Sequence, residues 1–223
     1  MDERYERNIG AVTETEQEVL MGKKAAIVGC GGLGGYVAEH LARIGIGALT
    51  LIDGDVFAES NLNRQLVSLE TNLGKSKASE ARKRLLQIRA DISIEVYNCI
   101  LNERNAIDLL KGHDVIIDAL DNIKTRLLIE RTANELKIPL IHGAVEEWGA
   151  QVCTVLPGDF TLSLLYKTKG EFPRPSVISF TPAFCASLQA AEAVKVLLNK
   201  ENILRKKLLT VDIKNYSFDI VEL

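Results

Sequence analysis

Four glycines and one aspartate form the first pattern in the sequence that could do chemistry. Gly29, Gly31, Gly32 and Gly34 fit a G-x-G-x-x-G pattern that follows an apolar run and opens a segment with helical spacing. Such glycines allow a tight turn and a close approach of the backbone to a phosphate, while the helix N-terminus supplies N–H donors. Asp53 ends the next apolar run, where a carboxylate can accept hydrogen bonds from ribose hydroxyls. The pattern predicts a nucleotide site.

Polar and cationic side chains follow Asp53 on a long connection and on the next helical segment. Asn61, Arg64 and Gln65 lie in the segment SNLNRQ, and Lys77 lies in GKSK. Guanidinium and ammonium groups neutralise phosphate oxygens in a transition state, so Arg64 and Lys77 favour a polyphosphate that is attacked and cleaved. Hydride transfer with NAD would need only the glycines and Asp53, and would leave these cations unexplained.

The segment DALDN places two carboxylates at the end of a further apolar run. Ligands bind outside the carboxyl ends of strands in open α/β sheets, so this segment should face the same crevice as the glycines. Mg²⁺ binds through one or two carboxylates plus substrate phosphates, and Asp121 is better placed for it than Asp118 because it lies beyond the strand. Asp121 or Asn122 could also cap a helix over residues 122–136.

Alternating strands and helices are needed to bring these residues together. Buried or alternating apolar runs predict strands at residues 24–30, 48–53, 92–98, 113–120, 137–143, 150–156, 208–213 and 217–223. Helical spacing predicts helices at residues 33–45, 74–89, 103–111, 122–136 and 183–198. Right-handed βαβ units give a Rossmann-like, mostly parallel, doubly wound α/β sheet, with antiparallel strands at the C-terminal end. We expect one domain over residues 1–223, with an N-terminal arm (1–22) and an irregular or partly extended crossover (157–182).

Composition narrows the class of protein. The 223 residues carry 27 basic and 30 acidic side chains, a net charge of −3, and no basic tract, which argues against nucleic acid as the main partner. Apolar runs are far shorter than the roughly 20 residues that span a bilayer, and the charged N-terminus does not resemble a secretory signal. We expect a cytoplasmic protein with no membrane partner. The four cysteines contain no CxxC pair, so no zinc site is predicted.

With these residues in hand, the sequence resembles the ubiquitin-activating-like superfamily of ThiF, MoeB and HesA proteins. The matching segments occur in family order: Tyr5-x-Arg7-Asn8, VGCGGLGG, LTLIDGDVFAESNLNRQ, LGKSKA, DALDN and SLQAAEAVKVL. The resemblance implies binding of ATP and Mg²⁺ and adenylylation of the C-terminal glycine of a ubiquitin-like sulfur carrier of the ThiS or MoaD type, ending in Gly-Gly. Thiamine and molybdopterin biosynthesis are the pathways it suggests.

The resemblance also assigns roles residue by residue. Gly32 would approach the phosphates, Asp53 would hold the ribose, and Asp121 would hold Mg²⁺. The triphosphate would contact Asn61, Arg64 and Lys77, with Gln65 in support. Arg7 resembles the family's arginine that reaches across a homodimer to the partner's ATP.

The sequence departs from the family at its cysteines. Many members hold zinc through two CxxC pairs or carry a reactive cysteine in the crossover, and this chain has neither. Cys185 lies nearby among apolar residues, which indicates packing rather than catalysis. We therefore expect adenylylation without a covalent enzyme–carrier thioester, and sulfur from a separate donor protein.

Three other functions stay open at this point. A tRNA-modifying dehydratase of the same superfamily would use the same ATP site. An NAD-dependent oxidoreductase is a different chemistry on the same fold, and a non-enzymatic protein could retain the ATP pocket.

Overall fold

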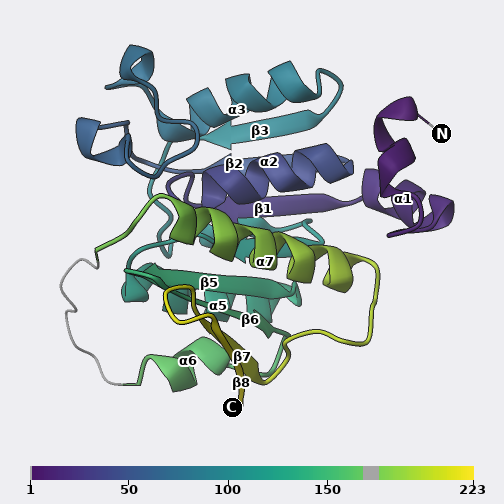
Figure 1. Ribbon diagram of the computed structural model, residues 1–223, viewed down its shortest axis with the longest axis vertical. Coiled ribbons are helices and arrows are strands. Elements are labelled where there is room, and N and C mark those ends of the chain that lie inside the picture. Colours follow the sequence, from purple (N-terminus) through teal and green to yellow (C-terminus); the bar gives the residue numbers. More distant parts are fainter. Residues whose placement is uncertain (1, 168–175) are drawn as a thin grey trace.

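A sheet of eight strands runs through the computed structural model, which describes residues 2–167 and 176–223 (Figure 1). The strands are β1 (Lys24–Val28), β2 (Ala48–Ile52), β3 (Ser93–Tyr97), β4 (Val115–Asp118), β5 (Leu140–Glu146), β6 (Gly149–Val155), β7 (Lys207–Asp212) and β8 (Ser217–Glu222). Their order is β3-β2-β1-β4-β5-β6-β7-β8. The first five strands in this order, β3, β2, β1, β4 and β5, pair in parallel. The last three, β6, β7 and β8, continue the sheet in antiparallel pairs. The predicted mostly parallel sheet with antiparallel C-terminal strands is confirmed.

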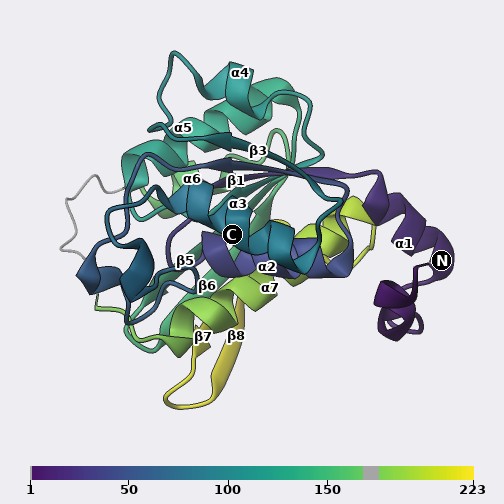
Figure 2. The ribbon, with the colours of Figure 1, turned by 90° about the horizontal axis from the view of Figure 1, so that it is seen from above.

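Helices cover both faces of this sheet. They are α1 (Glu14–Met21), α2 (Gly34–Ile44), α3 (Lys77–Ile88), α4 (Ala106–Leu110), α5 (Ile123–Leu136), α6 (Thr161–Leu165) and α7 (Phe180–Leu197). Successive residues of β1 point to opposite faces: Ala25 and Ile27 join the core under α2, α3 and α7, whereas Ala26 and Val28 join the core under α4, α5 and α6. Figure 2 shows α4 and α5 on one side of the strands and α2 and α7 on the other, as a doubly wound sheet requires.

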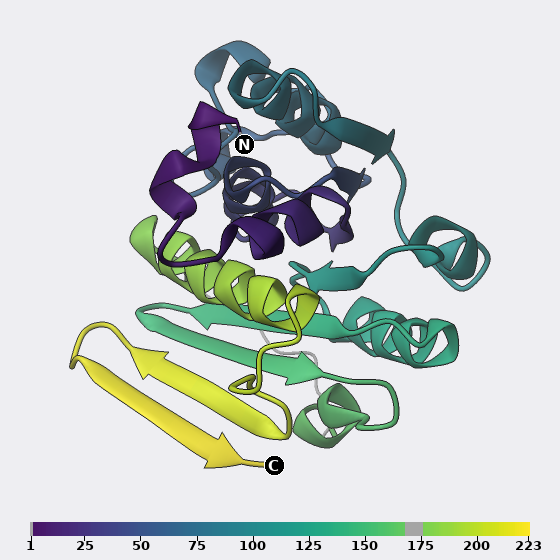
Figure 3. The ribbon, with the colours of Figure 1, turned by 90° about the vertical axis from the view of Figure 1, so that its right-hand side faces the viewer.

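The N-terminal arm consists of a 3-10 helix, η1 (Glu3–Asn8), followed by α1. Thr13 and Glu16 form a capping box that fixes the start of α1. The arm packs at the C-terminal end of α2, where Gln17 Nε2 donates to Ile44 O at 2.8 Å. The opposite end of the chain forms the β7–β8 hairpin, which Figure 3 shows as the last two strands at one edge of the sheet.

Several predicted boundaries were wrong. The described part of the crossover expected at 157–182 contains the short helix α6, which was not predicted, and residues 168–175 lie outside the described residues. The last helix begins at Phe180 rather than at residue 183, since Pro182 is tolerated in a first helical turn. The helix expected at 103–111 shortens to α4 because Asn102 and Asn105 form a hydrogen-bonded turn before it.

The connection between β2 and α3 returns on itself. It contains two 3-10 turns, η2 (Glu59–Asn61) and η3 (Glu70–Asn72). Phe57 N donates to Lys75 O at 3.0 Å, and Gly74 N donates to Phe57 O at 2.8 Å, so the two ends of the connection are tied together. None of the helices in the described part of the chain combines the length and hydropathy of a membrane span.

Candidate active site

Three parallel strands end at the same level and bring the predicted segments to one edge of the sheet. Val28, the last residue of β1, is in register with Ile52 of β2 and with Asp118 of β4. Hydrogen bonds continue past these ends, since Gly29 N donates to Ile52 O at 2.8 Å and Ala119 N donates to Val28 O at 3.0 Å. The glycine turn, Asp53 and the DALDN segment therefore begin side by side, as expected for a switch point in an open α/β sheet.

Two of the glycines are required by the turn itself. Gly29 has φ of +95°, and a Cβ there would lie 2.5 Å from a backbone oxygen of the loop after β4. A Cβ on Gly34 would lie 1.8 Å from the carbonyl oxygen of Gly29. A Cβ on Gly31 or Gly32 would make only ordinary contacts, at 3.4 Å with Gln65 and 3.5 Å with Pro182, so the turn itself does not require glycine at those two positions. The N-cap of α2 is Leu33, whose side chain makes no capping hydrogen bond, so no side chain satisfies the first-turn amides.

Asp53 ties the glycine turn to the connection that follows β2. Its Oδ2 accepts from Cys30 N at 2.6 Å, and its Oδ1 accepts from Asp55 N at 2.7 Å. Burial raises the pKa of Asp53, although both backbone hydrogen bonds and the Lys77 ammonium oppose that shift. A carboxylate has about four lone-pair sites, so two remain for a ligand's hydroxyl groups.

The SNLNRQ segment folds over the glycine turn. Asn61 fixes the segment's own backbone, because its Oδ1 accepts from Ala58 N at 3.0 Å. The Arg64 guanidinium donates to Ser60 O at 2.8 Å, and the Arg64 stem lies 4.0 Å from where a Cβ on Gly32 would be. Gln65 is buried against Gly31, and its Oε1 has no partner among the described residues. An unsatisfied buried amide oxygen beside the glycine turn fits a site that gains a hydrogen-bond donor from a ligand.

Lys77 points into the same region from the first residue of α3. Its side chain is 9% exposed, and its Nζ lies 2.9 Å from Asp55 Oδ2, on a carboxylate that is 69% exposed. Lys77 N also donates to Asp55 O at 3.1 Å. The Lys77 ammonium is thus held in a defined place by Asp55, two residues after Asp53. A phosphate group there would replace the solvated Asp55 carboxylate as the partner of the ammonium.

The two candidate roles in the DALDN segment fall on different residues. Asn122 caps α5, since its Oδ1 accepts from Thr125 N at 2.9 Å. Asp121 is exposed directly beyond β4, and its side chain has no hydrogen bond or ion pair within the described residues. Residues 2–167 and 176–223 hold no cluster of three or more His, Cys, Asp or Glu that could enclose a metal. A lone exposed carboxylate at this edge fits Mg²⁺, which takes few protein ligands and shares the substrate's phosphates.

The sequence pattern of the ThiF family matches residues 5–223 of this chain. The protein belongs to the ThiF family. Among curated relatives, the molybdopterin-synthase adenylyltransferase of Haemophilus influenzae is 34% identical over 99% of this chain and 93% of its own length. The SAMP-activating enzyme E1 of Haloferax volcanii is 32% identical over 98% of this chain and 84% of its own. The sulfur carrier protein adenylyltransferase of Thermus thermophilus is 33% identical over 97% and 85%.

Solved structures share the fold of this ThiF-family chain. E. coli MccB with ATP superposes with a TM-score of 0.86 at 22% identity, over all of this chain and 72% of MccB. PaaA superposes with a TM-score of 0.83 at 23% identity, over 99% of this chain and 82% of its own. At these identities the likeness shows the Rossmann-like fold.

One predicted site residue of the ThiF-family protein lies away from the others. Arg7 is exposed on η1, next to Asn8, whose side chain reaches Ile44 O at the C-terminal end of α2. The glycine turn precedes the N-terminal end of the same helix, and 11 residues of α-helix span about 16 Å. Figures 1 and 2 both place the arm and the η2–η3 connection at opposite sides of the molecule. Within one chain, Arg7 does not join the crevice.

A buried polar group behind the crevice was missed by sequence reasoning. Asp118 is fully buried, and its Oδ2 lies 2.6 Å from His142 Nδ1 on β5. Burial lowers the pKa of His142, although Asp118 opposes the shift. The pair exists because β4 and β5 are neighbours, with Asp118 opposite His142.

Three of the four cysteines are buried. Cys185 is buried on α7 with its Sγ 3.7 Å from the carbonyl oxygens of Ala144 and Gln151. Burial raises the pKa of Cys185 to about 12, so the thiol stays protonated at neutral pH. Cys30 and Cys153 are also buried, with their pKa values raised by desolvation. The interpretation of Cys185 as a packing residue is supported.

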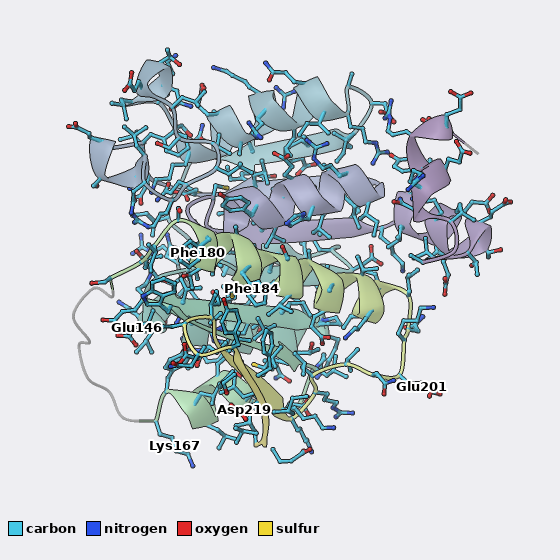
Figure 4. All side chains as sticks on the ribbon, in the orientation of Figure 1. Glu146, Lys167, Phe180, Phe184, Glu201 and Asp219 are labelled. Carbon is cyan, nitrogen blue, oxygen red and sulfur yellow. The ribbon has the colours of Figure 1, made fainter. Side chains whose placement is uncertain are left out.

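Aromatic side chains gather around the first turns of α7. The rings of Phe180 and Trp148 lie 5.0 Å apart, and those of Phe184 and Phe218 lie 6.0 Å apart. Figure 4 shows the labelled Phe180 and Phe184 at the end of α7 nearest the crevice, with Phe184 directed toward the β7–β8 hairpin. Pro182, in the same turn, lies 3.5 Å from where a Cβ on Gly32 would be. A partly exposed apolar surface therefore borders the glycine turn.

Proposed function

We propose that the whole chain acts as one ThiF-type domain that adenylates the C-terminal glycine of a ubiquitin-like sulfur carrier with ATP and Mg²⁺. The observation that carries this proposal is the single edge of the sheet where the glycine turn, Asp53, the SNLNRQ segment, Lys77 and Asp121 meet. The names of relatives with over 30% identity and nearly full coverage support the same activity. The carrier is of the ThiS or MoaD type, in thiamine or molybdopterin biosynthesis.

ATP binds with its phosphates over the glycine turn and its ribose at Asp53. Gly32, beside Arg64, brings its backbone close to the phosphates, and the first turn of α2, whose N-cap makes no side-chain hydrogen bond, adds N–H donors and positive potential. Asn61 and Gln65 donate to the phosphate chain through their amide N–H groups, and the buried Gln65 Oε1, which can only accept, takes a hydrogen bond from a ligand hydroxyl or an ordered water.

Adenylylation needs no protein nucleophile. A carrier carboxylate oxygen attacks the α-phosphorus, the bond from that phosphorus to the bridging oxygen breaks, and pyrophosphate leaves with the electron pair. Arg64 and Lys77 neutralise the charge that spreads over the phosphate oxygens, from positions that are fixed before the substrate arrives. Asp121 would hold Mg²⁺, which would supply further neutralisation of the phosphate charge. The product is a carrier acyl-adenylate. A separate sulfur donor protein converts it to a thiocarboxylate, with AMP as the leaving group, and no thioester between the carrier and this enzyme forms.

The carrier tail approaches along the apolar surface at the start of α7. Trp148 and Phe180 are 38% and 41% exposed and lie next to Pro182, which borders Gly32. An extended Gly-Gly tail is narrow enough to pass between such side chains and reach the α-phosphorus.

A homodimer completes the site with Arg7. The arm lies at the far end of α2 in its own chain, so Arg7 can serve only a nucleotide bound to a partner subunit. Mixing Arg7→Ala with Lys77→Ala protein would then form hybrid dimers with one intact site. We expect the mixture to regain part of the lost activity, whereas no recovery on mixing would contradict the role across subunits.

Label transfer tests the reaction directly. Protein, Mg²⁺ and ATP labelled at the α-phosphorus are incubated with a carrier that ends in Gly-Gly, and we expect label on the carrier. A carrier that lacks its last glycine is the matched control. Equal labelling of both carriers, or of neither, would contradict the proposed substrate.

A further inference from the structure

Helix α5 carries two buried side chains of opposite charge that both hold α6. Glu130 is 2% exposed, and its carboxylate accepts from Leu162 N at 2.5 Å and from Ser163 N at 3.0 Å at the start of α6. Arg126, one turn earlier, is 8% exposed and donates through NH1 to the hydroxyl of Tyr166 at 2.8 Å, directly after α6. The two side chains differ in their remaining contacts.

Arg126 also reaches the loop that carries Asp121. Its NH2 donates to Leu120 O at 2.5 Å, and its Nε lies 3.6 Å from Asp118 Oδ2. Asp118 Oδ1 in turn accepts from Leu120 N at 3.1 Å. Both the N–H and the C=O of Leu120 are therefore bound to buried charged side chains, and the next residue is Asp121.

The Tyr166 hydroxyl closes this arrangement into a ring. Arg126 and the Gln151 amide can only donate, at 2.8 and 3.1 Å, so the hydroxyl accepts from both and keeps its own proton to donate. His142 Nε2 lies 3.2 Å away and receives it, which leaves the His142 proton on Nδ1 for Asp118 Oδ2 at 2.6 Å. Each group thus has its position set by a neighbour.

A ring of buried polar groups is a costly way to pack two helices on a sheet. Apolar side chains of similar volume would fill the space without desolvating an arginine, an aspartate and a histidine. A closed hydrogen-bonded ring instead fixes one geometry, and the backbone it fixes here is that of Leu120. Within the ring, Arg126 Nε has no hydrogen-bond partner among the described residues and makes only the ion pair with Asp118. Glu130 lies on the same helix and holds the same α6, and among the described residues it accepts hydrogen bonds from Leu162 and Ser163 and none from the 119–121 loop.

We propose that Arg126 and Tyr166 are positioning residues, which hold the Leu120 backbone so that Asp121 meets Mg²⁺ at the nucleotide edge. This inference rests on the proposed function, in which Asp121 binds Mg²⁺ together with ATP. Neither residue touches substrate: each acts through the peptide before Asp121.

The test measures how much Mg²⁺ strengthens ATP binding, by calorimetric titration of ATP into the full chain with Mg²⁺ and with EDTA. Tyr166→Phe removes only the hydroxyl, and Arg126→Lys keeps the charge but loses the two-pronged donation to Leu120 O and Tyr166. We expect each variant to lose about tenfold of the Mg²⁺-dependent gain, as partners behind a metal ligand do, with ATP binding in EDTA unchanged.

Glu130→Gln is the matched control, because it weakens the hold on α6 without touching Leu120. We expect it to lower the free energy of unfolding yet to keep the full Mg²⁺-dependent gain. A gain in Tyr166→Phe and Arg126→Lys equal to that of the unchanged protein would overturn the positioning role while leaving the proposed function intact. A gain absent from the unchanged protein itself would overturn both. If Tyr166→Phe does not fold, Arg126→Lys alone decides.

Discussion

Replacing Lys77 by methionine separates the chemistry of the crevice from the stability of the fold. The Lys77 side chain is 9% exposed, whereas the Asp55 carboxylate that it contacts is 69% exposed. Lys77→Met keeps the length and volume of the stem and removes only the ammonium. The carboxylate left behind is already solvated, so the free energy of unfolding should change by about 0–1 kcal/mol, as for exposed ion pairs.

Activity should respond very differently. A preorganised group aimed at charge that develops in a transition state contributes about 2.7–4 kcal/mol, so Lys77→Met should lower kcat of pyrophosphate exchange by about 10²–10³-fold. Lys83→Met is the matched control, since Lys83 lies on the same helix, pairs with Glu80 at 2.5 Å and is 64% exposed. We expect that control to exchange pyrophosphate at the rate of the unchanged protein. Exchange by Lys77→Met within about threefold of the unchanged rate, with stability preserved, would refute the electrostatic role of Lys77.

Three further predictions follow from the same geometry. Asp121→Asn should reduce exchange activity and raise the Mg²⁺ concentration needed for half of the maximal rate, so that excess Mg²⁺ restores part of the activity; an unchanged Mg²⁺ dependence would rule out Asp121 as the ligand. Gly34→Ala should lower the free energy of unfolding by more than about 4 kcal/mol, because its Cβ would lie 1.8 Å from a backbone oxygen. Gly32→Ala should keep the free energy of unfolding of the unchanged protein in denaturant titration and should bind ATP more weakly. Equal stabilities of the two variants would contradict this account of the turn. Cys185→Ala should keep its exchange activity, because burial raises the pKa of the thiol to about 12, and a loss of activity in a folded variant would reveal a covalent role.

The parallel half of the fold and the meeting of the predicted segments at one edge of the sheet were predictable because their signals are local. Each of these features is recognisable within a few residues of sequence: the glycine turn, the apolar runs and the polar connection. The rule that ligands bind at the carboxyl ends of parallel strands then predicts that they lie together. The register of Val28 with Ile52 and Asp118 bears this out.

The features that were missed depend on contacts between distant residues. Helix α6 has only five residues and owes its place to Glu130, more than 30 residues earlier in the chain, so no local pattern announces it. The Asp118–His142 pair exists because β4 and β5 are neighbours, which spacing alone does not specify. Arg7 belongs to a matching segment, but its distance from the crevice appears only once η1 packs against the end of α2.

Exchange of labelled pyrophosphate into ATP tests the central claim most directly. The assay combines the protein with Mg²⁺, ATP and, one at a time, small carriers that end in Gly-Gly, with NAD binding measured alongside. We predict exchange that depends on one carrier and on its terminal glycine, together with no NAD binding at concentrations that saturate the ATP site. ATP binding without exchange for any carrier would contradict adenylylation as the function of this edge of the sheet.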